Sequence, residues 1–206
     1  HKRINIANAL LLLFSLIFYA WGEPVFILIM LTSIGLNYLV GRVIAAIDSS
    51  TKGYWLLLGI AANLGLLFHF KYLGFVFATI AGWGGLTLEV PQIALPIGIS
   101  FFTFQAITYL VDLYYGKIAV QKSLLKLALY ISFFPQLIAG PIVRYAEIEQ
   151  QLSSRSISVD SFSAGVRRFL IGLAKKVLLA NTFAGVADEI FAMPAGELSA
   201  PLIMIA

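Results

Sequence analysis

The two histidines are the first residues to consider as catalytic groups. A histidine beside an acceptor hydroxyl is the usual general base of acyl transfer. The chain has only His1, which is terminal, and His69, which lies beside Lys71 at the end of an apolar run. Ionisable groups at such helix ends are readily solvated, so we interpret His69 as a solvated helix end.

Other catalytic patterns are missing from the sequence. Asp112 and Glu89 are separated by Pro91 and Pro96, and nothing brings them together, so we expect Asp112 to cap a helix or pair with a nearby lysine. Without cysteine there is no thiol nucleophile and no Cys-based zinc site. The sequence shows no metal-ligand spacing, serine triad or phosphate loop. Local chemistry alone therefore predicts no catalytic residue and no metal site.

Uncharged polar residues stand inside apolar surroundings, and hydrogen bonds between helices explain most of them. They are Ser100, Thr103, Gln105 and Thr108 in one predicted helix, and Ser132 and Gln136 in a later segment. Arg144 follows the pair Gly140 and Pro141. Its guanidinium could hold a phosphate or carboxylate, although an interfacial arginine on the cytoplasmic side is the favoured interpretation.

The composition excludes a water-soluble domain. Of 206 residues, 60% are hydrophobic and 12% charged, and the mean hydropathy is +0.93. Charge-free runs such as 4–22, 24–41 and 53–70 approach the length of a membrane-spanning helix. We predict an all-α polytopic membrane helix bundle, a single membrane domain over 1–206 with a polar connector at about 147–160. The net charge of +4 is spread between apolar runs, which favours membrane topology over nucleic-acid binding.

The segment 124–141 is predicted to be a re-entrant or broken helix. A full crossing would place the later basic residues opposite all the earlier ones, against the positive-inside tendency. Pro135 and the Gly140-Pro141 pair interrupt the run. Irregular backbone at membrane depth persists only where protein buries it or where it lines a watery cavity, so this segment indicates a pathway.

Two further elements complete the predicted organisation. A third span is expected over about 54–70, followed by an interrupted stretch over 71–96. Apolar residues from Phe162 to Val177 share one helical stripe, which predicts an interfacial helix. Because the chain opens at His1 and closes inside an apolar run, we expect it to be a fragment, incomplete at both ends.

Four segments in order resemble the membrane-bound O-acyltransferase family, most closely its bacterial branch of alginate O-acetyltransferase-like proteins. They are 18–24 (FYAWGEP), 95–105 (LPIGISFFTFQ), 133–142 (FFPQLIAGPI) and 172–178 (GLAKKVL). The resemblance covers about Asn8 to Phe191, an N-terminal portion of the family's sequence.

This resemblance implies a multi-pass enzyme of the bacterial inner membrane. It would move an acetyl or other acyl group from a cytoplasmic donor thioester, acetyl-CoA, through a tunnel toward a cell-surface or exported polysaccharide or a periplasmic acceptor protein. No bound cofactor is implied. The family's catalytic histidine is expected downstream of Ala206, so the fragment alone would be inactive. Gln105, Gln136 and Arg144 are our candidates for the tunnel wall, with Arg144 near the cytoplasmic mouth.

Two other interpretations stay open. The broken helix could form a permeation site in a transport or lipid-handling protein, which would move substrate without covalent change. Alternatively, the fragment could be a non-catalytic scaffold that docks a partner acyltransferase.

Overall fold

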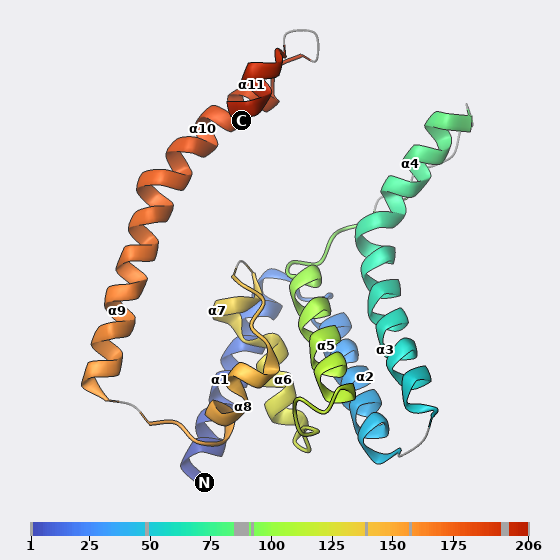
Figure 1. Cartoon of the computed structure of the whole chain (residues 1–206), viewed down its shortest axis with the longest axis vertical. Helices are drawn as coiled ribbons and strands as arrows, with labels where there is room; N and C mark the ends of the chain where they lie inside the picture. Colours follow the sequence, from blue (N-terminus) through green and yellow to red (C-terminus); the bar gives the residue numbers. More distant parts are fainter. Residues whose placement is uncertain are drawn as a thin grey trace. The chain divides into compact units, whose positions relative to one another are not determined.

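The computed structural model describes residues 2–47, 50–84, 91, 93–138, 140–156, 158–194 and 198–205. Every regular element within these residues is a helix, which confirms the predicted all-α fold (Figure 1). The chain divides into two compact units, residues 1–155 and 156–206, and each is described by itself. The prediction of one membrane domain over 1–206 stays a prediction.

The first unit is a bundle around α5. Its helices are α1 (Lys2–Gly22), α2 (Ile27–Ala46), α3 (Lys52–Leu67), the π-helical turn η1 (Phe68–Tyr72), α4 (Leu73–Gly84), α5 (Ile99–Tyr114), α6 (Leu124–Ser132), α7 (Phe134–Leu137) and α8 (Tyr145–Ser153). Helix α5 packs against α2, α3, α6 and α8. Buried side chains of α5 such as Phe102, Tyr109 and Leu110 therefore form the centre of the core.

Small and amide side chains let α2, α3 and α5 approach closely. A Cβ atom built on Gly59 of α3 would lie 2.6 Å from Leu110 Cδ1 of α5, so a larger residue there would force a neighbouring side chain or helix to shift. Asn37 of α2 and Asn63 of α3 are buried and exchange hydrogen bonds of 3.1 and 2.8 Å through their amides. In an apolar environment such a pair satisfies polar groups that lipid cannot.

The predicted third span ends too early. Helix α3 continues through η1 into α4, and this path is apolar over Lys52–Trp83. Gly74 and Gly82 do not end it, because a single glycine costs an α-helix only about 1 kcal/mol and the π turn at 68–72 absorbs the irregularity within the helical path. Residues 85–90 and 92, and with them Glu89, lie outside the described residues.

The predicted break in the segment 124–141 is confirmed. Helix α6 ends at Ser132, Phe133 is non-helical, and α7 begins at Phe134, with Pro135 in its first turn where no backbone N–H is needed. The chain then returns along α6, since Tyr130 Oη donates to Val143 O at 2.8 Å and Lys126 Nζ donates to Ser153 Oγ at 2.9 Å. Residues 124–153, which we call the hairpin, thus begin and end at the same end of the bundle.

Protein groups satisfy the irregular backbone of the hairpin. The side-chain amide of Gln136 donates to the Tyr130 carbonyl at 2.9 Å, and the Phe134 N–H donates to the buried Ser15 hydroxyl of α1 at 3.4 Å. These contacts supply the hydrogen bonds that α6 would have made had it continued, as irregular backbone at membrane depth requires.

The second unit is formed by α9 (Val159–Ala174), the π-helical turn η2 (Lys175–Ala180), α10 (Asn181–Phe191) and α11 (Ala200–Ile205). Ser158 caps α9, its hydroxyl accepting from the Ser161 N–H at 3.1 Å. By length and composition, four described helical paths could cross a membrane: Arg3–Gly22, Ile27–Ala46, Lys52–Trp83 and Val159–Phe191. The interfacial placement of α9 stays a prediction, because its path is also long enough to span.

Candidate functional site

Three tyrosines fix the hairpin to the core. The ring of Tyr145, the first residue of α8, lies with its centroid 5.2 Å from that of Tyr109 in α5 and 5.3 Å from that of Tyr130 in α6, both edge to face. All three side chains are fully buried. Such aromatic pairs stabilise beyond the area that they bury, so the start of α8 is rigidly placed.

Gln121 connects two of these tyrosines by hydrogen bonds. Its backbone N–H donates to Tyr109 Oη at 3.1 Å, and its side-chain amide donates to Tyr145 Oη. Burial raises the pKa of Tyr145 to about 12, even further above physiological pH than an ordinary phenol, so the group stays neutral. This cluster positions the backbone and offers no general base.

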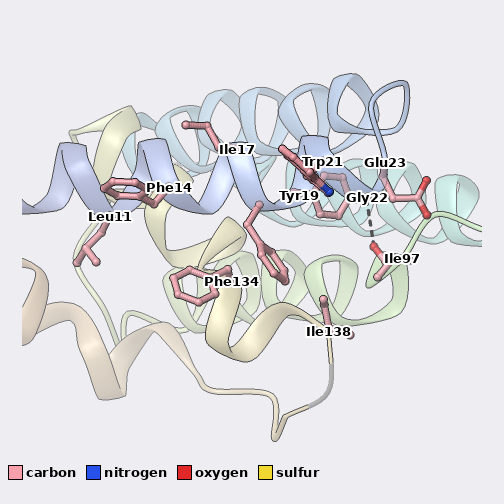
Figure 2. A pocket seen from close by; sticks show the side chains of 11 residues that line it. Leu11, Phe14, Ile17, Tyr19, Trp21, Gly22, Glu23, Ile97, Phe134 and Ile138 are labelled. Carbon is pink, nitrogen blue, oxygen red and sulfur yellow. Dashed lines mark hydrogen bonds between the residues drawn. The ribbon is translucent and has the colours of Figure 1, made fainter.

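An open apolar groove of about 630 Å³ lies between α1 and α7 (Figure 2). At one end of it Tyr19 Oη donates to Ile97 O at 3.0 Å, and Glu23 is its one charged lining residue. The lining residues are Leu11, Phe14, Ile17, Phe18, Tyr19, Trp21, Gly22, Glu23, Ile97, Phe134 and Ile138. Its chemistry suits a hydrocarbon surface, and it offers no catalytic constellation.

A smaller cavity of about 120 Å³ lies among α1, α6, α7 and α8, and we call it the Gln136 cavity. Its walls combine apolar side chains with three polar ones. The lining residues are Leu11, Leu129, Tyr130, Phe133, Gln136, Gln151, Ile148, Leu152 and Arg155. A few polar groups in an apolar lining are typical of small-molecule sites, but such sites usually enclose about 300–1,000 Å³. This cavity is therefore a candidate for holding one part of a substrate.

Arg155 is held at this cavity by a buried asparagine. Asn8 of α1 is fully buried, its Nδ2 donates to Leu152 O at 2.9 Å, and its Oδ1 accepts a hydrogen bond from Arg155 Nη2. Sequence reasoning missed both residues. The available signal was an asparagine inside the charge-free run 4–22, where a buried amide requires a partner.

The three predicted tunnel residues are not brought together. Gln105 is buried in α5, and its Oε1 has no hydrogen-bond partner in the described structure. Gln136 lines the cavity named after it. Arg144 is exposed at the start of α8 and does not line either cavity described above. Whether they line a tunnel stays a prediction.

The remaining ionisable candidates behave as structural or surface groups. His69 is exposed within the π turn, its ring packed edge-on against Phe70 with centroids 4.9 Å apart. Asp112 pairs with Lys117 at 3.6 Å, which confirms the expected pairing with a nearby lysine.

Comparison with known proteins identifies relatives over most of the chain. The membrane-bound O-acyltransferase family model matches residues 117–206. The probable alginate O-acetylase of Pseudomonas aeruginosa is 38% identical over 192 residues, which cover 90% of this chain and 37% of that protein. The peptidoglycan O-acetyltransferase of Helicobacter pylori is 34% identical over 86% of this chain and 39% of that protein.

A more distant match is the teichoic acid D-alanyltransferase of Bacillus subtilis, 29% identical over 40% of this chain and 22% of that protein. No solved structure matches. The chain thus spans well under half the length of the curated relatives that it matches.

Proposed function

The chain belongs to the membrane-bound O-acyltransferase family, and on this basis we propose that it forms the N-terminal part of an enzyme that O-acylates a cell-surface or exported polysaccharide. The observation that carries the proposal is the 38% identity to an alginate O-acetylase over 90% of the chain. A second relative is named for peptidoglycan and a third for teichoic acid. Acceptors therefore differ within the family, while transfer of an acyl group to a surface polymer is common to these names.

The acyl donor is proposed to be acetyl-CoA, used from the cytoplasmic side. Two of the relatives are named as O-acetylating proteins. The end of the first unit where the hairpin begins and ends also carries Arg3, Lys122, Lys126 and Arg155. Because cytoplasmic segments are enriched in lysine and arginine, we assign this end to the cytoplasm and the protein to the bacterial inner membrane. The acyl acceptor, a polysaccharide or a periplasmic carrier protein, would be met at the opposite end.

Within that enzyme, we propose that these residues form the scaffold and one wall of the substrate tunnel. The hairpin is supported for this role by its interrupted backbone beside an amphipathic cavity, which is where a membrane protein tolerates irregular structure. Gln105 and Gln136 are proposed to face the tunnel, and Arg144 to lie near its cytoplasmic mouth. The general base is proposed to be a histidine outside residues 1–206, because His69 is exposed in the π turn.

The test is polysaccharide O-acetylation by the full-length protein in a host strain from which its gene is deleted. Restored acetate on the polysaccharide, dependent on an acetyl thioester, supports the enzyme, whereas flux of substrate without covalent change would support a transporter. Arg144→Ala should reduce donor use more than it reduces the amount of folded protein. Unchanged donor dependence at equal abundance would remove Arg144 from the site. Product formed only when a separate acyltransferase is supplied would support the scaffold alternative.

A further inference from the structure

The guanidinium of Arg155 is oriented by a side chain with no freedom of its own. Asn8 is fully buried in α1, and both ends of its amide are used, the Nδ2 by Leu152 O and the Oδ1 by Arg155 Nη2. A buried amide in an apolar helix is costly unless it is bonded on both sides. Asn8 therefore couples α1 to the end of α8 and holds the exposed Arg155 side chain through one hydrogen bond.

Within the first unit, no described carboxylate forms an ion pair with Arg155. The ion pair that the described residues of this unit contain joins Lys117 to Asp112. A guanidinium has five N–H donors in a planar fork, and Asn8 accepts from one nitrogen. The remaining donors suit an oxyanion, because a fork of this kind binds phosphate or carboxylate in a bidentate manner.

The adjoining cavity indicates what the oxyanion is attached to. The Gln136 cavity of about 120 Å³ adjoins Arg155 and is walled by Leu129, Phe133 and Leu152. Its Gln136 side chain donates through Nε2 to Tyr130 O at 2.9 Å, which leaves Oε1 as an acceptor for a ligand N–H. The lining thus suits a narrow chain that alternates methylene groups with amides and ends in an anion.

We propose that Arg155, positioned by Asn8, binds the phosphate of a phosphopantetheine arm, part of which enters the Gln136 cavity. This arm has two amides separated by methylenes, a phosphate at one end and the acyl thioester at the other. The inference rests on the proposed acyltransferase function and adds the donor site within this chain. Coenzyme A and an acyl carrier protein both carry this arm. The site is therefore assigned to the arm, and the experiment distinguishes these two sources of it.

The decisive test compares two donors that carry the 4′-phosphate with one that lacks it. The full-length protein in detergent would be assayed with acetyl-CoA, acetyl-4′-phosphopantetheine and acetyl-pantetheine. Arg155→Gln should raise the KM of the two phosphate-bearing donors about tenfold or more, the expected loss for one charge-assisted hydrogen-bonded contact. The KM of acetyl-pantetheine should stay unchanged. An unchanged KM for the phosphate-bearing donors would overturn the proposal.

Lys122→Gln is the matched control for charge. Lys122 is exposed at the same end of the bundle, and its side chain lines neither cavity described above. It loses the same positive charge, so its KM values should match those of the wild type. If Lys122→Gln and Arg155→Gln weaken donor use equally, general attraction of an anion explains the effect and the specific site is wrong.

Asn8→Leu tests the positioning role. If Asn8 acts through Arg155, this variant should raise the KM of acetyl-4′-phosphopantetheine but not that of acetyl-pantetheine. A merely structural role would change both donors equally, because neither the packing of α1 nor the amount of folded protein depends on the donor. Equal effects on the two donors would remove Asn8 from the site.

Direct binding separates this proposal from the proposed function. Titration of the full-length protein with 4′-phosphopantetheine should show about tenfold weaker binding for Arg155→Gln, whether or not acyl transfer is observed. Absence of acyl transfer from every donor would refute the enzyme, while equal binding by both proteins would refute the site. A carrier-protein source is indicated if an acylated carrier protein supports transfer sensitive to Arg155→Gln and acetyl-CoA does not.

Discussion

The amino nitrogen of Lys126 lies 2.9 Å from the hydroxyl oxygen of Ser153, which brings the first turn of α6 against the last residue of α8. The 26 residues between them run away from this end of the bundle and come back to it. The helix is interrupted on this path, between Ser132 and Phe134. A straight helix of that length would be about 39 Å long. The hairpin therefore folds back within the bundle, and both of its ends lie on the same side of the bundle.

This relationship predicts the accessibility of single cysteines. In the full-length protein cleared of any other cysteine, Ser123→Cys and Ser153→Cys should both react with a membrane-impermeant maleimide from the cytoplasmic side only. Glu23→Cys, in the turn between α1 and α2 at the other end of the bundle, should react from the periplasmic side and is the matched control. Labelling of Ser123→Cys and Ser153→Cys from opposite sides would show that the hairpin is a full crossing.

Features fixed by neighbouring residues could be predicted from the sequence. The break near Pro135 depends on proline, whose backbone preferences act locally. The pairing of Asp112 with Lys117 likewise needs only five residues of chain. A charge-free run long enough to span a bilayer predicts a membrane helix without knowledge of its partners.

Features that depend on residues far apart in the chain could not be predicted. Asn8 bonds Leu152, which is 144 residues away, and a single sequence contains no signal that joins them. The continuation of α3 into α4 was missed because the π turn at 68–72 has no sequence signature as strong as that of proline. The candidate site contains both kinds of feature. Gln136 was proposed from its setting in the sequence, whereas Arg155 required its contact with α1.

Gly59 is predicted to be required for the contact between α3 and α5. In Gly59→Ala, the new Cβ would lie 2.6 Å from Leu110 Cδ1 and 3.1 Å from Val40 Cγ1, so the helices or side chains must shift. Such overpacking costs about 1–3 kcal/mol in the free energy of unfolding. Gly65→Ala in the same helix meets nothing within 4 Å and should be neutral or slightly stabilising. Thermal unfolding of the purified full-length protein measures both, and equal melting temperatures would contradict the close packing.

The amide pair of Asn37 and Asn63 predicts a non-additive response to substitution. Asn37→Leu leaves the Asn63 amide without its partner across the helix interface, and we expect a loss of about 1–2 kcal/mol. The double variant removes both amides and should lose less than the sum of the two single variants. Thr32→Val in α2 is the control, because the Thr32 hydroxyl is exposed and bonds its own helix. Strict additivity in a double-mutant cycle would show that the two amides are not coupled.

Gly98 and Gly116 separate the cost of backbone conformation from the cost of contact with the hairpin. Both have positive φ, +74° and +69°, where alanine costs about 1–2 kcal/mol. A Cβ on Gly116 meets nothing within 4 Å, but one on Gly98 would lie 2.8 Å from the backbone carbonyl oxygen of Leu137 in α7.

Gly116→Ala should therefore lose stability only modestly and keep its acyl transfer. Gly98→Ala should lose more stability, because a backbone atom cannot rotate away. At matched amounts of folded protein it should also lower acyl transfer by displacing α7 and Gln136 from the start of α5. Equal losses for the two variants, measured by thermal unfolding and by acetate incorporated per folded molecule, would show that the contact between α5 and the hairpin does not support the site.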